Sequence, residues 1–93
     1  MENVPKVKLR LFVTGQTPRS QRAIANLRRI SEEQFSARYQ IIVVDVLEHP
    51  DWAEQEKILA TPTLIKELPL PLRRVIGDLS DTEKVLLALD LEI

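Results

Sequence analysis

The 93-residue sequence has no cysteine, two glycines, one histidine and four aromatic residues. Without cysteine, it can form no disulfide bond, no thiolate metal site and no thiol nucleophile. The two glycines, Gly15 and Gly77, lie far apart, which excludes a glycine-rich loop for phosphate. The single histidine, His49, stands beside Glu48 and Asp51, but a metal site needs more ligands at better spacing, so we expect none.

The sequence also lacks an excess of charge of one sign. Its net charge is −1, which argues against nucleic acid or another polyanion as a partner. The charges are unevenly distributed, however: residues 1–47 carry eight basic and four acidic residues, and residues 48–93 carry five and ten. This asymmetry suits self-association or a partner of complementary charge, and a surface that is simply mixed explains it equally well.

Long apolar runs are missing as well. None approaches the roughly 20 residues that span a bilayer, and residues 1–5 lack the basic and apolar parts of a signal peptide. We therefore expect a cytoplasmic protein that does not bind membranes. The length and the 44% hydrophobic content predict one globular domain over residues 1–93.

The first half has a strand–helix–strand pattern. Residues 7–13 alternate in the way that is typical of a strand with one buried face. Thr17 and Pro18 favour a helix start, because threonine can cap and proline fits the first helical position. Apolar residues then recur at helical spacing to about Phe35 or Ser36. Residues 41–46 are almost all β-branched, which predicts a central parallel strand that is covered on both faces.

The second half begins with weaker signals. Pro50 predicts the start of a short helix, and Thr61-Pro62 marks a break before a strand that includes residues 63–65. Pro69 and Pro71 cannot donate to a central ladder, so they predict an extended connection or an edge.

A weak strand and a helix are predicted to follow. Residues 73–76 form a short β-branched segment that ends at Gly77. Ser80 and Glu83 have the spacing of a capping box ahead of a leucine-rich final helix.

The resulting order, β-α-β-α-β-β-α, resembles the thioredoxin-like α/β fold. Thioredoxins carry a CxxC pair after the first strand, where this sequence reads Gly15-Gln16-Thr17-Pro18. Thiol redox chemistry is therefore excluded. Pro62 stands where that fold usually has a cis-proline, which costs only about 0.5–1 kcal/mol relative to the trans form.

Four segments carry a more specific likeness: residues 11–18 (LFVTGQTP), 44–47 (VDVL), 57–64 (KILATPTL) and 68–80 (LPLPLRRVIGDLS). Together they resemble the KaiB family of small circadian clock proteins, and the likeness extends over about residues 7–91. Ile42 and Ala25 stand where basic residues are frequent in that family. The sequence is therefore identified as a divergent member.

The resemblance implies a non-enzymatic binding protein. KaiB-family proteins bind the N-terminal ATPase ring of KaiC, capture KaiA and displace a thioredoxin-like domain of a clock histidine kinase. They are also metamorphic: a resting homotetramer or homodimer has a βαββααβ fold, whereas the KaiC-bound monomer is thioredoxin-like. The resemblance thus implies a KaiC-like ATPase as the main partner, and KaiA or a clock histidine kinase as a further one.

The resemblance also points to particular binding residues. In the family, the lysine that matches Lys57 faces KaiC, although an ordinary solvated lysine would look the same. Arg22, Arg73 and Arg74 match family arginines linked to assembly, and the planar guanidinium suits interface carboxylates; Arg74 could equally serve the resting oligomer. Trp52 is either an exposed hot spot or a partly buried core residue.

The carboxy-terminal pattern is ambiguous. Residues 85–91 have helical spacing, but their leucines also alternate with Ala88 and Asp90, so two packings a few kcal/mol apart are conceivable. The residues that we associate with a fold switch are Pro62, Pro69, Pro71, Ala88 and Asp90. Ala88 replaces a glycine of some family members. Because alanine is favoured over glycine in a helix by about 1 kcal/mol, Ala88 is predicted to favour the thioredoxin-like packing.

Two other functions stay open at this stage. The chain could be a thioredoxin-like adaptor or sensor domain that never switches fold and has no redox activity. An enzyme is the weaker alternative, because the sequence offers no nucleophile–base pair. We expect no enzymatic activity and no cofactor.

Overall fold

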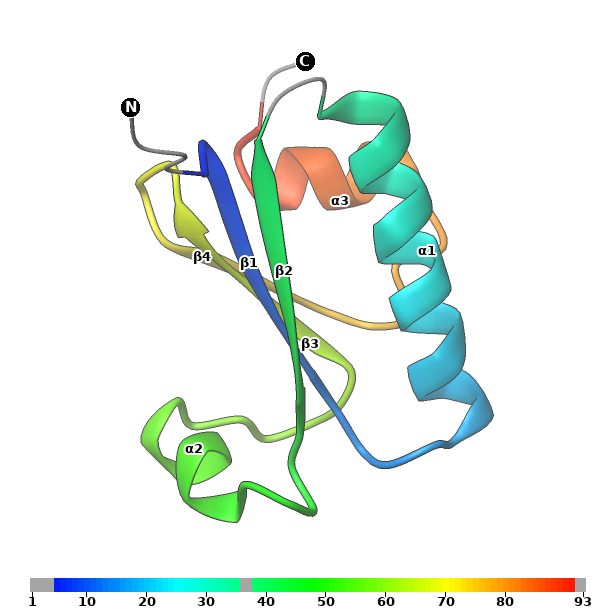
Figure 1. Cartoon of the computed structure of the whole chain (residues 1–93), viewed down its shortest axis with the longest axis vertical. Helices are drawn as coiled ribbons and strands as arrows, with labels where there is room; N and C mark the ends of the chain where they lie inside the picture. The colour runs from blue at the N-terminus through cyan, green and yellow to red at the C-terminus, as the bar shows by residue number, and fades with distance from the viewer. Residues whose placement is uncertain (1–4, 36–37, 92–93) are drawn as a thin grey trace.

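The computed structural model describes residues 5–35 and 38–91, which form a four-stranded sheet and three helices (Figure 1). The elements are β1 (Val7–Val13), α1 (Pro18–Gln34), β2 (Tyr39–Asp45), α2 (Pro50–Gln55), β3 (Thr63–Leu68), β4 (Arg73–Ile76) and α3 (Thr82–Ala88). The predicted order of strands and helices is confirmed. The strands lie in the order β2-β1-β3-β4.

β1 is the central strand of the first half. It pairs in parallel with β2, with Leu9 opposite Ile41, and antiparallel with β3, with Leu11 opposite Leu64. Leu9, Leu11 and Val13 face the helices α1 and α3, as the alternation predicts. The prediction of a single buried face is wrong, however, because Phe12 on the opposite face is also fully buried.

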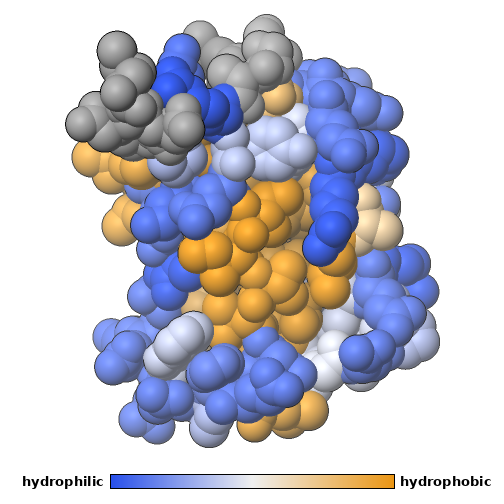
Figure 2. Space-filling model, viewed as in Figure 1, coloured by the Kyte–Doolittle hydropathy of each residue, from blue (hydrophilic) through white to orange (hydrophobic). Residues whose placement is uncertain are grey.

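The position of β2 corrects another prediction. We expected a central strand that is covered on both faces, but β2 pairs only with β1 and forms an edge of the sheet. Val43 is accordingly 38% exposed. The physical reason is that β3 turns back and takes the other side of β1. The apolar area in the middle of Figure 2 lies in the space between this edge and α1.

α1 is positioned by its caps and its apolar stripe. The Thr17 hydroxyl accepts a hydrogen bond from the Ser20 backbone N–H at 3.2 Å, and Pro18 occupies the first turn. The helix ends at Gln34 with Phe35 as its C-cap, close to the predicted end. Its buried apolar residues, Ala23, Leu27 and Ile30, pack on β1 and on α3, so both helices share one core.

α3 begins one residue away from the predicted cap. Asp81, not Ser80, is the N-cap, and its carboxylate accepts from the Lys84 N–H at 3.2 Å. The backbone N–H of Ser80 instead donates to Asp78 Oδ1 at 3.1 Å. The Ser80–Glu83 capping box is therefore wrong, because Ser80 belongs to the turn that precedes the helix. Val85 and Leu89 bury this short helix against the sheet.

No helix within residues 5–35 and 38–91 has both the length and the apolar character that crossing a bilayer demands.

Candidate protein-binding surface

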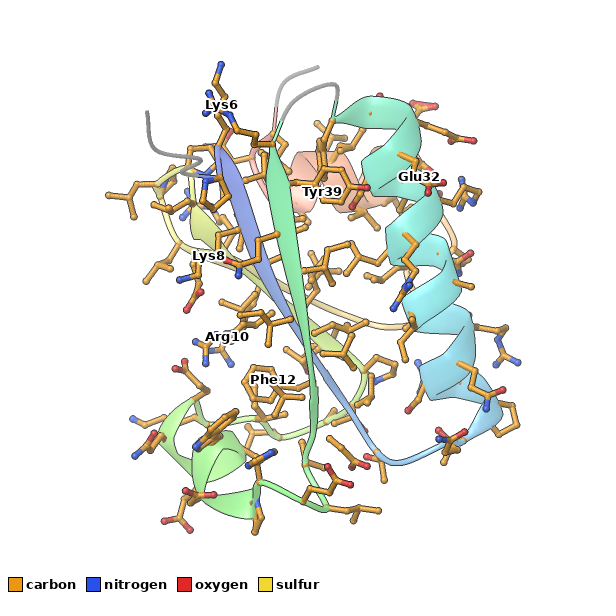
Figure 3. The ribbon with its side chains drawn as sticks, viewed as in Figure 1. Lys6, Lys8, Arg10, Phe12, Glu32 and Tyr39 are labelled. Atoms are coloured by element: carbon orange, nitrogen blue, oxygen red, sulfur yellow. The ribbon has the colours of Figure 1, made fainter. Side chains whose placement is uncertain are left out.

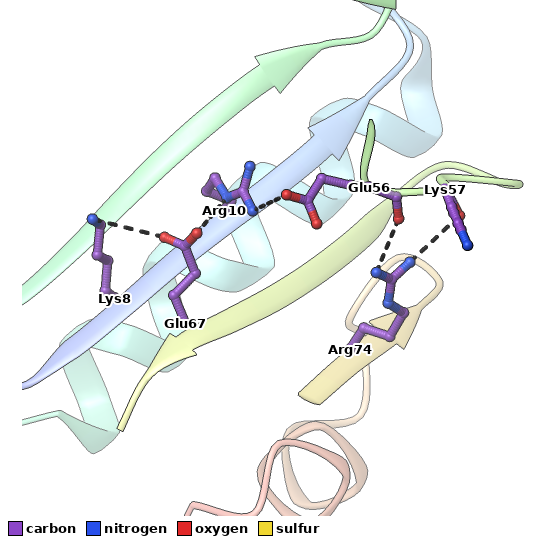
Figure 4. Close-up of polar contacts among 6 residues, drawn as sticks. All are labelled: Lys8, Arg10, Glu56, Lys57, Glu67 and Arg74. Carbon is purple, nitrogen blue, oxygen red and sulfur yellow. Dashed lines mark hydrogen bonds and ion pairs between the residues drawn. The ribbon is translucent and has the colours of Figure 1, made fainter. Parts of the chain in front are cut away.

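Arg10 on β1 joins two glutamates on the sheet face that points away from α1 (Figure 3). Its Nη2 donates to Glu56 Oε2 at 2.8 Å, and its Nε lies 2.9 Å from Glu67 Oε2. Lys8 Nζ is 3.8 Å from the other oxygen of Glu67 (Figure 4). Glu56 follows α2 directly and Glu67 belongs to β3. The Arg10 cluster therefore ties the end of α2 to the sheet.

Arg74 on β4 fixes the backbone just after α2. Its guanidinium donates to the carbonyl oxygens of Glu56 at 3.0 Å and of Lys57 at 3.5 Å (Figure 4). Such carbonyls at a helix end lack partners inside the helix. Lys57 has φ +55°, the left-handed conformation that often ends a helix. Arg74 thus holds the backbone from which the exposed Lys57 side chain projects.

A groove of about 530 Å³ runs beside this contact. Its lining residues are Arg10, Glu56, Ile65, Glu67, Leu72, Arg73 and Arg74. Arg73 donates to the carbonyl of Leu72 at 3.0 Å and is exposed. The structure therefore brings three of the predicted binding residues, Lys57, Arg73 and Arg74, to the same region.

Trp52 lies at the surface of α2, close to this region. Its ring is stacked on His49, with centroids 4.0 Å apart and an angle of 13° between the planes. Trp52 is 41% exposed, and with Glu56 and Arg10 it lines a second groove of about 440 Å³. Leu59, two residues after Lys57 in the chain, is 95% exposed. A large aromatic side chain and an exposed leucine next to basic groups can form the centre of a protein interface.

Arg22 does not belong to this surface. It lies on α1, and its Nε is 3.7 Å from Asp78 Oδ2 in the loop after β4. The pKa of Asp78 is lowered chiefly by a hydrogen bond from the Ser80 side chain. The Ser80 backbone and the nearby guanidinium groups of Arg22 and Arg19 lower this pKa further.

The residues associated with the fold switch are spread over the second half. The peptide bonds before Pro62, Pro69 and Pro71 are all cis, as predicted for Pro62. Pro62 is buried, whereas Pro69 and Pro71 are exposed in the connection from β3 to β4. Ala88 is the exposed last residue of α3, and Asp90 just beyond it has φ +57°.

The sequence did not identify Arg10, Glu56, Glu67 or the fully buried Lys66. Arg10 and Glu67 look like the solvated face of half-buried strands, and Glu56 looks like a solvated residue at the end of a helix. The signal that could have found them is the opposite charge of Lys8 and Arg10 on one strand and Glu67 on another. Which strands are neighbours is decided only by the tertiary fold.

Within residues 5–35 and 38–91, no group of three histidine, aspartate or glutamate side chains could hold a metal ion. Directly before the position of the thioredoxin CxxC pair, the hydroxyl of Thr14 shares a hydrogen bond with that of Thr61, the residue that precedes Pro62.

Comparison with known sequences identifies relatives over most of the chain. Residues 10–91 match the KaiB domain family. The chain is 57% identical over 86 residues to the circadian clock protein KaiB3 of a Synechocystis strain, which covers 92% of this chain and 84% of that protein. It is 59% identical over 83 residues to the circadian clock oscillator protein KaiB of Synechococcus elongatus, which covers 89% and 81% respectively.

Comparison with solved structures confirms the predicted thioredoxin-like α/β fold. The N-terminal domain of Synechococcus elongatus SasA superimposes with a TM-score of 0.76 at 23% identity, over 97% of this chain and 89% of that one. Mitochondrial thioredoxin 3 of Saccharomyces cerevisiae gives a TM-score of 0.72 at 16% identity, over 95% and 80%. At these identities the likeness concerns the fold alone.

Proposed function

Because the chain belongs to the KaiB family of circadian clock proteins, we propose that it is a timing regulator that binds the ATPase ring of a KaiC-like protein. Bound to the ring, it would modulate the phosphorylation or ATPase cycle of that protein. The observation that carries this proposal is the Lys57 surface, which consists of Lys57, Arg73, Arg74, Trp52 and Leu59. Basic and apolar groups stand together there without a catalytic group.

The geometry supports Lys57 as the central contact. Its backbone is fixed by Arg74, so the ammonium group can meet a partner carboxylate without ordering the backbone first. The exposed Leu59 side chain lies two residues further along the chain. An interface with an apolar centre and a charged rim would place its charges in this manner.

We propose binding without catalysis. The only histidine, His49, is stacked on Trp52 directly before α2, and no carboxylate hydrogen-bonded to it is found within the described residues. A general base would need such a neighbour or a substrate proton within reach.

Backbone conformation supports the proposal that the second half has another packing. Within residues 5–35 and 38–91, the non-glycine residues with positive φ are Lys57, Leu79 and Asp90, at +55°, +65° and +57°. All three belong to the half that the resemblance marks as the one that rearranges. The left-handed region costs an L-residue about 1–2 kcal/mol, so this packing carries local backbone strain in the second half.

The mechanism that we propose is conformational selection. The free protein would rest as a homotetramer or homodimer in the βαββααβ arrangement, and the thioredoxin-like monomer would bind the ring. A small population of the binding fold lowers the apparent affinity and slows association. KaiA or a clock histidine kinase would be the secondary partner.

Size-exclusion chromatography with a purified KaiC homologue tests the proposal. We expect a slowly forming complex in one nucleotide state. The variant Lys57→Ala should weaken the complex at least tenfold, whereas Lys84→Ala, which removes the same charge from the exposed side of α3, should not. The absence of a complex in every nucleotide state would reject the proposed function, and a complex that tolerates Lys57→Ala would reject the proposed surface.

A second candidate function is favoured by one observation: residues 5–35 and 38–91 already have the thioredoxin-like topology. A non-switching adaptor would show a monomeric mass and a single set of NMR peaks, both alone and with a partner.

A further inference from the structure

Lys66 on β3 is fully enclosed by protein. Its exposed fraction is 0%, which is rare for a lysine. It lies opposite Leu9 on β1 and two residues after Leu64, so it points to the sheet face that α1 and α3 cover. The enclosure therefore depends on the packing of the carboxy-terminal helix over the sheet.

The ammonium group is poorly compensated at that place. An ammonium has three donors, and Lys66 Nζ donates one hydrogen bond, 3.4 Å long, to the carbonyl oxygen of Asp90. Within the described ranges, no other acceptor lies within hydrogen-bond reach of Nζ. Asp90 directly follows the C-cap of α3, where the carbonyls of a helix attract a cation. One long bond recovers only part of the hydration that a buried charge loses.

The charged groups that face Lys66 do not compensate for the hydration that its buried ammonium loses. Burial lowers the pKa of Lys66 below its ordinary value. The Asp90 carboxylate beyond α3 raises this pKa, and the Arg73 guanidinium, across from Lys66 on β4, lowers it again. In the docked packing the ammonium therefore loses its proton more easily than in any packing that returns Lys66 to water.

We propose that the Lys66 side chain controls the docking of α3, a role that we call the gate. α3 can pack over β3 only if the Lys66 ammonium is buried or loses its proton. At neutral pH the free-energy cost of burying the ammonium opposes the docking of α3. The carboxy-terminal half is therefore easily displaced from the sheet. The gate rests on the two packings proposed above and adds the residue that sets their balance. Between the lowered pKa of the docked packing and the ordinary pKa of lysine, docking releases the proton of Lys66. Rising pH should therefore favour docking over this range.

Hydrogen exchange on the free chain tests the gate. The amides of Leu89 and Asp90, which donate to Val85 and Leu87, report whether α3 is docked. The variant Lys66→Met keeps a long side chain without the charge. We expect it to raise the protection factors of these amides severalfold at pH 7, because the docked packing then no longer encloses a charge. The matched control is Lys84→Met, which removes a charge from the exposed side of α3 and should leave the protection factors unchanged.

The pH dependence gives the second measurement. The gain in protection from Lys66→Met should shrink as the pH rises through the ordinary pKa of lysine, about 10.4, because the wild-type amine is neutral in both packings above that pH. The ε-carbon NMR signal of Lys66 should titrate below the ordinary pKa of lysine. If the free chain shows two sets of peaks, Lys66→Met should enrich the set with a protected α3.

Two results would overturn the gate. One is a loss of protection in Lys66→Met at pH 7, which would mean that the bond to Asp90 holds α3 more than the buried charge loosens it. The other is an ordinary titration of Lys66. No partner takes part in these measurements, so a failure to bind a KaiC-like ring would reject the proposed function and leave the gate standing.

Discussion

Asn26 on α1 donates a hydrogen bond of 2.8 Å from its side-chain amide to the backbone carbonyl of Asp78, 52 residues later in the chain. The bond joins the two halves of the sequence, because α1 belongs to the first half and Asp78 to the loop between β4 and α3. Arg22 adds an ion pair to the same residue. The position of α3 is thus partly set by α1.

Removing that bond should loosen the attachment of the loop. Asn26→Ala leaves the Asp78 carbonyl without its donor, so we expect the free energy of unfolding to fall by about 1 kcal/mol. Urea denaturation followed by circular dichroism measures the change. Gln21→Ala is the control, because its amide contacts only the exposed Gln16 side chain. Equal losses in the two variants would contradict the proposed attachment.

Asp78 should make stability depend on pH. Its pKa is lowered in the folded state, chiefly by the Ser80 side chain, so the ionised form is favoured by folding. This contribution is fully present above the ordinary pKa of aspartate, about 3.9, and is lost as the pH falls through the lower folded value. Asp78→Asn should therefore lower the urea midpoint at pH 7.

The difference in urea midpoint between Asp78→Asn and the wild type should disappear as the Asp78 carboxyl becomes protonated in both the folded and the unfolded state. Measurements at pH 7, 4 and 2.5 follow the trend. Glu48→Gln removes an exposed carboxylate and should shift the midpoint little at any of these values. A constant difference across the series would show that Asp78 acts through something other than its charge.

The two neighbouring arginines of β4 should differ in their effect on partner binding. Arg74→Ala removes the donor to the Glu56 and Lys57 carbonyls, so Lys57 loses its fixed backbone as well as a neighbouring charge. Arg73→Ala removes a charge whose hydrogen bond goes to the adjacent Leu72 carbonyl. We expect a several-fold larger rise in the dissociation constant for Arg74→Ala, measured by biolayer interferometry with a KaiC homologue. A larger effect of Arg73→Ala would reject this assignment.

Ala88→Gly should shift the balance between packings. Glycine is less favourable than alanine in a helix by about 1 kcal/mol, and Ala88 ends α3 in the half that is proposed to rearrange. We expect a second set of NMR peaks to gain population severalfold. Ala25→Gly makes the same substitution on the exposed side of α1 and should lower overall stability without adding peaks. A single set of peaks in both variants would reject the role of Ala88.

The first half of the fold could be predicted because its signals are local. The Thr17-Pro18 start of α1 and the alternation of β1 are decided within a few residues. The edge position of β2 could not be predicted, because a β-branched run is the same in a central strand and in an edge strand. That position depends on β3, which returns antiparallel to the other side of β1.

The polar residues of the second half escaped prediction for a related reason. Lys66 and Glu67 are adjacent on β3 and both look solvated in the sequence. In the fold, Glu67 pairs with Arg10 on the α2 side and Lys66 is enclosed under the end of α3. At the start of α3, Ser80 and Asp81 are both good caps, and the turn at Asp78 decides between them.

The central place of β1 has a consequence for any rearrangement of the chain. Its partner on one side, β2, comes from the amino-terminal half, and its partner on the other, β3, comes from the carboxy-terminal half. A rearrangement of the carboxy-terminal half would therefore break the β1–β3 ladder, which includes the Leu11–Leu64 pair. The separation of β1 from β3 would expose a row of unpaired amide and carbonyl groups along β1. Such a row can pair with a new strand from the same chain or from another copy.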